Sequence, residues 1–414
     1  MLRQFRDRLE SAPLPLRLLV CAALLKFLCA GFYLPWFTNG SDFALVHGAG
    51  AKVLAGQGAQ VYGDFFAYRP EDENTMFFMY PPAVALFYAP LAALPFRAAL
   101  TLFELLGLAA VLGVFAVWAR HRRLQPFSEA YYLAFSAILL FFPLDLSAWL
   151  GQNDALVLFL VVLALAGKDR PWLSGLALAS AVWLRVFLGF VLVYLLIQRR
   201  WRQLMGTVFW LAALAGLSLV FVPWSTQLHY FAQLGRHLGI ESFYDNQSLT
   251  GLFYRALTDS GYTMGIVNAP DLARVLTALA SLLLIAGFVS VTLRGGGEAD
   301  FDEGFGLALV TALLLSPHSD THHQALLLVP LLLFLERRAV RSASLLYYGF
   351  FAAFVPVIAF RFLDQERLIA FASGLWSLAY SIPVLVLLGF WFHCAAGLRR
   401  EALRAPGCAP ARTR

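Results

Sequence analysis

One acidic residue follows the first long apolar segment and could act as a base. Asp42 stands in Asn39-Gly40-Ser41-Asp42-Phe43, just after the apolar segment 14–36. A carboxylate at the end of such a segment can accept the proton of a bound hydroxyl. Aspartate and serine also favour the first position of a helix, so Asp42 could instead cap a helix over 43–56. The two roles are compatible, and the sequence leaves both open.

One cation interrupts an apolar stretch. Arg185 lies inside 173–197, where a charge is costly unless it faces protein, water or a ligand. Its guanidinium group suits bidentate binding of a phosphate. The alternative is a structural ion pair inside the bundle. We expect Arg185 to contact a phosphate.

Histidines cluster in the segment 316–323, Ser-Pro-His-Ser-Asp-Thr-His-His. Histidine with aspartate raises the possibility of a metal site, but the spacing matches no zinc motif, and we expect none. Hydrogen bonding from His322 or His323 to a phosphate is the favoured interpretation. Because adjacent helical residues point about 100° apart, at most one of the two should face a given site.

Three further polar segments are Tyr80-Pro81-Pro82, Gly151-Gln152-Asn153-Asp154 and Asp245-Asn246-Gln247-Ser248-Leu249. The amides of the second could hold hydroxyls or a phosphate. Simpler explanations are a helix start for Tyr-Pro-Pro, a turn for Gly-Gln-Asn-Asp and a polar loop for Asp-Asn-Gln-Ser-Leu. The expected substrate-binding residues are Tyr80, Gln152, Asn153, Asn246 and Gln247.

The composition indicates the class of protein that contains these residues. Of the 414 residues, 60% are hydrophobic and only 14% are charged, whereas a soluble domain has about a quarter charged residues. The net charge of +6 comes from short arginine runs between apolar stretches, which is typical of the cytoplasmic loops of membrane proteins and not of nucleic-acid binding. The chain is therefore predicted to be an all-α, polytopic transmembrane bundle with about 11–13 membrane helices.

The arginine runs also predict the orientation. If they face the cytoplasm, the segments 37–80, 224–269 and 316–323 face outward. Residues 81–96 then form a re-entrant or partial element, because a full crossing would place the arginines at 120–123 outside. Residues 1–400 are expected to form one domain, and 401–414 a basic, disordered cytoplasmic tail.

Taken together, these motifs resemble glycosyltransferase family 87, the polyprenol-phosphate-mannose-dependent mannosyltransferases of the membrane-embedded C-type superfamily. The resemblance extends from about Asp42 to His323. Between them the motifs keep the family's order: Gly56-x5-Tyr62, Tyr80-Pro81-Pro82, Gly151-Gln152-Asn153, a cation before Arg199-Arg200-Trp201-Arg202, Asn246-Gln247-Ser248-Leu249 and Ser316-Pro317.

The resemblance implies a function and a site. The implied activity moves a sugar, most simply mannose, from a polyprenyl-phosphate donor to a glycolipid or glycan acceptor. The implied base is Asp42, and Arg185, where the family commonly has lysine, lies with His322 and His323 at the donor phosphate. Inverting displacement without metal or cofactor is implied, at the extracytoplasmic face of a bacterial inner or plasma membrane.

Other classes fit the composition. A lipid or solute transporter is also polytopic, but it favours inverted repeats and charges at mid-bilayer, and no repeat is visible. A C-type transferase of another sugar, such as arabinose, would share the motifs. A non-enzymatic scaffold would leave Asp42, Arg185 and His322 unexplained.

Overall fold

The computed structural model describes residues 2–62, 78, 80–234, 242–293, 298–352, 370 and 373–404. Residues 63–77 and 79 of the expected external loop 37–80 therefore lie outside the described residues, as do 235–241 of the next loop and 405–414 of the tail. Residues 401–404, expected to be disordered, belong to the last helix.

The described residues form helices and no strand, which confirms the predicted all-α class. The helices before residue 200 are α1 (Leu2–Ser11), α2 (Leu14–Phe37), α3 (Ser41–Leu54), η1 (Gly58–Gln60), α5 (Pro82–Ala92), α6 (Phe96–His121), α7 (Glu129–Leu139), α8 (Phe142–Leu150), α9 (Asp154–Ala166), α10 (Pro171–Leu184), η2 (Val186–Gly189) and α11 (Phe190–Ile197). The later ones are α12 (Trp201–Phe221), α13 (Trp224–Leu234), α14 (Leu249–Leu257), α15 (Pro270–Thr292), α16 (Glu298–Leu315), η3 (Thr321–Leu327), α17 (Leu328–Glu336), α18 (Val340–Ala352), α21 (Trp376–Tyr380) and α22 (Ile382–Arg404).

Five segments of the described chain are long and apolar enough to cross a bilayer: α6, α7 with α8, α12, α15 and the part of α22 up to Arg399. With 21 residues α12 is about 32 Å long, enough for a hydrocarbon core about 30 Å thick. The chain is thus a polytopic helical membrane protein. Shorter apolar helices lie between these spans. One of them, α5, is about 16 Å long, too short to cross alone, in agreement with the partial element expected at 81–96.

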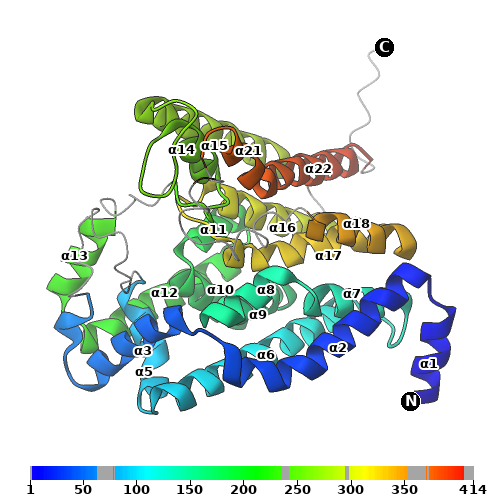
Figure 1. Cartoon of the computed structure of the whole chain (residues 1–414), viewed down its shortest axis with the longest axis horizontal. Coiled ribbons are helices and arrows are strands. Elements are labelled where there is room, and N and C mark those ends of the chain that lie inside the picture. Colours follow the sequence, from blue (N-terminus) through cyan, green and yellow to red (C-terminus); the bar gives the residue numbers. More distant parts are fainter. Residues whose placement is uncertain are drawn as a thin grey trace.

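The helices are stacked in tiers. Figure 1 shows α22 at the top, α16 and α17 beneath it, then α8 and α9, with α6 at the bottom. The core is continuous across these tiers and runs from Leu16 of α2 to Leu398 of α22.

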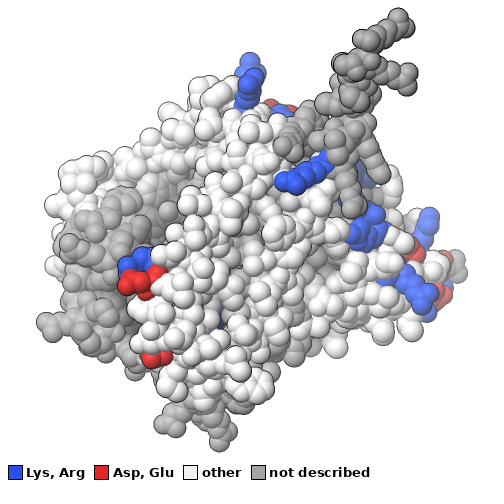
Figure 2. Space-filling view, turned by 90° about the horizontal axis from the view of Figure 1, so that it is seen from above, with Lys and Arg blue, Asp and Glu red and all other residues white. Residues whose placement is uncertain are grey.

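Polar contacts gather at the two ends of α6. Near its last turn, Asp302 of α16 accepts hydrogen bonds from His121 (2.7 Å), Arg122 (3.1 Å) and Lys168 (3.1 Å). At its other end, α6 begins at Phe96, shortly after α5. Helix α5 itself begins at Pro82, directly after Tyr80 and Pro81. Because α6 has 26 residues, its two ends lie about 39 Å apart. Figure 2 shows one face of the molecule, on which lysine and arginine gather mostly towards the right-hand end and the broad middle is almost uncharged.

Candidate active site

The first turn of α3 is tied by its backbone to the end of α8. The N–H groups of Asn39 and Gly40 both donate to the carbonyl of Trp149, at 2.9 and 3.3 Å. Gly40, with φ of 64°, is the residue that caps α3. Asp42 therefore lies inside the first turn, and the expectation that it caps the helix is wrong.

The end of α8 needs a glycine. Gly151 ends the helix with φ of 73°, a conformation that side chains disfavour. A Cβ atom at Gly151 would lie 2.7 Å from Cβ of Phe43, the residue after Asp42. This close approach brings Gln152, the next residue, against the start of α3.

Gln152 connects the carboxylate to the buried cation. Its Nε2 donates to Oδ2 of Asp42 at 2.7 Å. Its Oε1 accepts from Nη2 of Arg185 at 2.7 Å and from the hydroxyl of Tyr80 at 2.9 Å. Because the oxygen faces two donors and the nitrogen faces a carboxylate, the amide has only one sensible orientation. The structure thus brings four predicted site residues into one network.

Arg185 is also part of a buried ion pair. Its Nη2 and Nε lie 2.9 and 3.0 Å from Oδ1 of Asp154, and the side chains of Arg185 and Asp154 are 5% and 1% exposed. The ion-pair alternative is therefore correct as geometry, while the remaining donors of Arg185 face Tyr80 and Gln152. Asp154 was not among the predicted site residues. In the sequence, Asp154 begins one apolar run and Arg185 ends the next. Two opposite charges in apolar sequence could have indicated this pair.

The backbone of Tyr80 is held by a second tyrosine. The hydroxyl of Tyr62 donates to the carbonyl of Tyr80 at 2.6 Å. Pro81 caps α5 and Pro82 begins it, so the expected helix start is confirmed. Burial raises the pKa of the Tyr80 phenol, and the neighbouring Arg185 opposes this only in part. The phenol stays protonated, as its donation to Gln152 requires.

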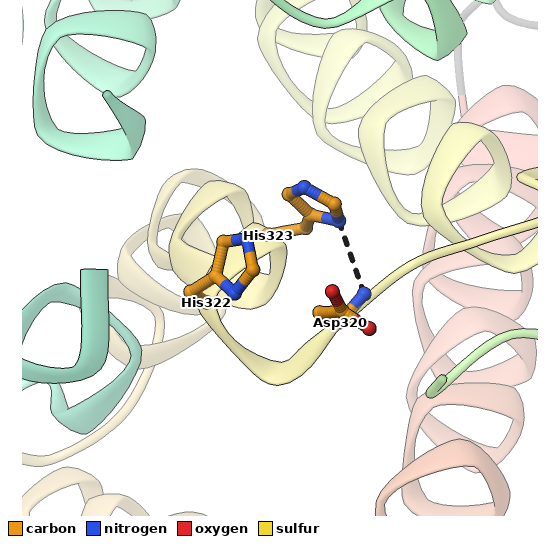
Figure 3. Close-up of side chains that lie close together, drawn as sticks. All are labelled: Asp320, His322 and His323. Carbon is orange, nitrogen blue, oxygen red and sulfur yellow. Dashed lines mark hydrogen bonds between the residues drawn. The ribbon is translucent and has the colours of Figure 1, made fainter. Parts of the chain in front are cut away.

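The two adjacent histidines have different environments. His322 and His323 lie in η3 with ring centroids 4.3 Å apart, as Figure 3 shows. Nδ1 of His323 accepts the backbone N–H of Asp320 at 3.0 Å, the dashed line in Figure 3. Phe187, two residues after Arg185, packs edge-on against His323 with a centroid distance of 5.6 Å. This contact places η3 beside the Arg185 network.

Both ring nitrogens of His322 are buried, and neither has a hydrogen-bond partner in the part of the chain that the structure describes. Oδ2 of Asp154 is a second buried acceptor in the same state. Leaving such atoms unsatisfied costs about 1–3 kcal/mol each unless a ligand or water meets them. The arrangement therefore leaves a basic ring and a carboxylate oxygen available to a substrate.

The same segment has the spacing of a cation site. The ligand atoms of Asp320, His322 and His323 all lie within 4.8 Å of one another. Two features oppose such use: Nδ1 of His323 already accepts a backbone N–H, and Oδ2 of Asp320 lies 2.9 Å from Nε2 of His318. His322 is the member best placed to bind a ligand.

The other predicted binding residues support the site from outside it. Oδ1 of Asn246 accepts the backbone N–H of Ser319 at 3.0 Å, and its Nδ2 donates to the carbonyl of Pro317 at 2.9 Å. The backbone N–H of Gln247 donates to the carbonyl of Ser319 at 2.6 Å. Both side chains are fully buried, so the polar-loop interpretation of this segment is wrong. They fix the turn that carries His322.

Asn153 takes a similar supporting part. It is 1% exposed and donates from Nδ2 to the hydroxyl of Tyr88 at 3.1 Å. Arg255, fully buried, holds the same region by donating to the carbonyl of Phe243 (3.1 Å) and to the hydroxyl of Ser381 (2.8 Å).

A small cavity of about 90 Å³ lies next to Gln152, between α2, α6 and α8. Its lining includes an ion pair between Lys26 and Asp145, with N and O 2.5 Å apart, and the buried carboxyl group of Glu104. The sequence interpretation missed these three residues, although each is a charge inside an apolar run.

These features define a polytopic helical membrane protein with a polar site assembled where its helices end. A family model narrows the assignment, since glycosyltransferase family 87 matches residues 78–317. The chain belongs to this family and is a membrane glycosyltransferase.

Curated relatives agree with the family. The chain is 28% identical, over 87% of its length and 82% of the relative, to the polyprenol-phosphate-mannose-dependent alpha-(1-2)-phosphatidylinositol pentamannoside mannosyltransferase of Mycolicibacterium smegmatis. It is 31% identical, over 93% of its length and 85% of the relative, to the protein of the same description in Mycobacterium tuberculosis. A phosphatidylinositol mannoside mannosyltransferase of M. smegmatis is 26% identical over 72% of the chain and 70% of the relative. No solved structure gives a significant match.

Proposed function

We propose that the chain transfers mannose from a polyprenyl-phosphate donor to a hydroxyl of a glycolipid at the outer face of a bacterial plasma membrane. The descriptions of the relatives supply the donor and suggest a phosphatidylinositol mannoside as the acceptor class. The observation that carries the proposal is the network that joins Asp42, through Gln152, to Arg185.

Asp42 acts as the base. It is half-buried at a helix start, and only Gln152 and Ser41 are hydrogen-bonded to its carboxylate among the described residues. The acceptor oxygen attacks C1 of the sugar while Asp42 takes its proton. The bond from C1 to the phosphate oxygen breaks, and its electron pair leaves with polyprenyl phosphate. One displacement inverts the configuration at C1.

The phosphate lies towards Arg185 and His322. Asp154 neutralises much of the charge of Arg185, so the guanidinium serves chiefly as an oriented donor. His322 supplies ring nitrogens that no group of the described residues satisfies. Together they stabilise the charge that develops on the leaving oxygen. No divalent cation takes part in this step, since these groups meet the phosphate directly.

The charge distribution supports an outward-facing site. The cluster of His121, Arg122 and Lys168 around Asp302 lies at the far end of α6 from Tyr80 and α5. Because basic segments favour the cytoplasmic side, the Asp42 end faces outward.

The test is direct transfer by purified protein. Protein in phosphatidylcholine vesicles is given labelled polyprenyl-phosphate-mannose and a phosphatidylinositol mannoside, and the lipids are separated after the reaction. The expected result is a new labelled glycolipid that the Asp42→Asn variant does not make. Label that crosses the bilayer without new product would instead indicate a flippase. Transfer only from polyprenyl-phosphate-arabinose would reject mannose as the sugar.

A further inference from the structure

A second cavity lies far from Asp42, between α16, α17 and α22. It has a volume of about 230 Å³, enough for roughly eight water-sized groups. Pro330, Leu333 and Phe334 of α17 form an apolar wall, and Ala396 and Gly397 of α22 lie opposite. Arg337, Arg338 and His393 supply polar groups. An apolar slot with a basic rim is the shape that an anionic lipid requires.

Acidic residues at this end of the bundle are committed to other cations. Asp302 accepts hydrogen bonds from His121, Arg122 and Lys168, while Glu336 forms an ion pair with Arg122 at 2.8 Å. Glu303, which also lines the cavity, is paired with Arg337. These contacts leave no carboxylate of the described residues for Arg338, the remaining arginine of the cavity.

Arg338 is oriented but not neutralised. Its guanidinium carbon lies 4.1 Å from the centre of the Phe334 ring, and its Nη2 donates to Nε2 of His393 at 3.1 Å. No carboxylate of the described chain is within ion-pair distance of it, in contrast to the neighbouring Arg337. A fixed cation with no counter-ion, beside an apolar cavity, has a charge complementary to one phosphate group.

We infer that this cavity, defined by Arg338, Phe334, His393 and Gly397, binds an anionic phospholipid of the membrane. The headgroup phosphate meets Arg338, and part of one acyl chain lies against Leu333 and Phe334. The site is separate from the Asp42 network, because it sits with the Asp302 cluster at the other end of α6. It would stabilise the contact of α17 with α22 without taking part in sugar transfer.

The experiment compares two lipids that differ only in headgroup charge. Detergent-purified full-length protein is titrated with dioleoyl phosphatidylglycerol or dioleoyl phosphatidylcholine. Bound lipid is counted by native mass spectrometry, and Tm is measured in parallel. Wild type should prefer phosphatidylglycerol, with a rise in Tm. The Arg338→Gln variant should lose roughly fivefold in affinity for phosphatidylglycerol, from about 1 kcal/mol per arginine.

Two further variants separate a site from a merely basic surface. Arg341→Gln removes the same charge three residues away, from an exposed position outside the cavity, and should behave as wild type. Gly397→Leu fills the cavity without changing charge, since nothing lies within 4 Å of a Cβ there, and should weaken phosphatidylglycerol binding. Equal losses in Arg338→Gln and Arg341→Gln, or full binding by Gly397→Leu, would overturn the site. So would a wild type that binds both lipids equally.

Discussion

The amide of Gln152 donates to Oδ2 of Asp42 at 2.7 Å, although 110 residues separate them in the chain. The contact depends on the pairing of the α3 start with the α8 end through the carbonyl of Trp149. Since the other side of the same amide accepts from Arg185, a change at the cation can reach the base. This relation shapes the predictions that follow.

Replacement of Asp42 by asparagine should abolish most transfer and leave the fold intact. Asparagine keeps the size of the side chain and removes its basicity, so turnover should fall on the order of 10²-fold or more. The measurement compares sugar transfer, donor binding and Tm with those of wild type. Near-normal transfer by a well-folded Asp42→Asn protein would end the assignment of Asp42 as base.

Replacement of Gln152 by alanine should slow sugar transfer and should lower donor affinity only in part. The loss of a hydrogen bond to an ionised partner costs about 1.5–3 kcal/mol, or roughly 10- to 100-fold in rate. Gln198→Ala is the matched control, because that amide donates to the carbonyl of Thr292, away from the site. If both variants lose the same activity, the loss comes from general destabilisation and the bridging role is rejected.

Replacement of Arg185 alone should destabilise the protein. It leaves Asp154 buried without its cation, which typically lowers the free energy of unfolding by about 3–5 kcal/mol. The double variant Arg185→Gln with Asp154→Asn removes both charges and should recover most of the lost Tm. It should not recover transfer or donor affinity, because the donor phosphate has lost its guanidinium. Wild-type donor affinity in the stable double variant would remove Arg185 from the donor site.

Chelators should leave transfer unchanged. His323 and Asp320 already bond within the protein, so the segment 318–323 is expected to act through His322 alone. The measurement is transfer with and without EDTA, together with elemental analysis of the purified protein. Strong inhibition that added divalent metal reverses, and that Asp320→Asn reproduces, would establish a metal site instead.

Topology can be tested with single cysteines in a background from which the native cysteines have been removed. Val267, 52% exposed in the loop 258–269, should be labelled from outside as Val267→Cys. Arg202→Cys, in the first turn of α12, should be labelled only after the membrane is made permeable. The opposite pattern would invert the orientation and the proposed location of the site.

The sequence predicted the residues that are chemically conspicuous on their own. Asp42 follows a long apolar segment, and Arg185 is a charge inside another, so each could be found without knowing its neighbours. The helical class follows from run length and composition, and the short element at 81–96 follows from the positions of the arginine runs.

What the sequence could not supply is pairing. Asp154 looks like any polar residue of a turn until α9 and α10 fold back and bring it to Arg185. Asn246 and Gln247 read as a solvated loop, yet they are buried because they satisfy the backbone around Ser319. Lys26 and Asp145 come from helices whose contact no local pattern encodes. Each of these residues acquires its role from a partner more than 30 positions away.

The close approach of Gly151 to Phe43 has a genetic consequence. Any side chain at 151 must push α3 away from α8. The distance between Gln152 and Asp42 is therefore set by the backbone, and a change of side-chain rotamer cannot restore it. In a random-mutagenesis screen for loss of sugar transfer, missense alleles at codon 151 should resemble those at codon 42, even alanine among them. Suppressors at Phe43 should be rare, because every residue except glycine keeps the Cβ that clashes, and the backbone atoms of Gly40 and Phe43 lie only 3.2 and 3.4 Å away.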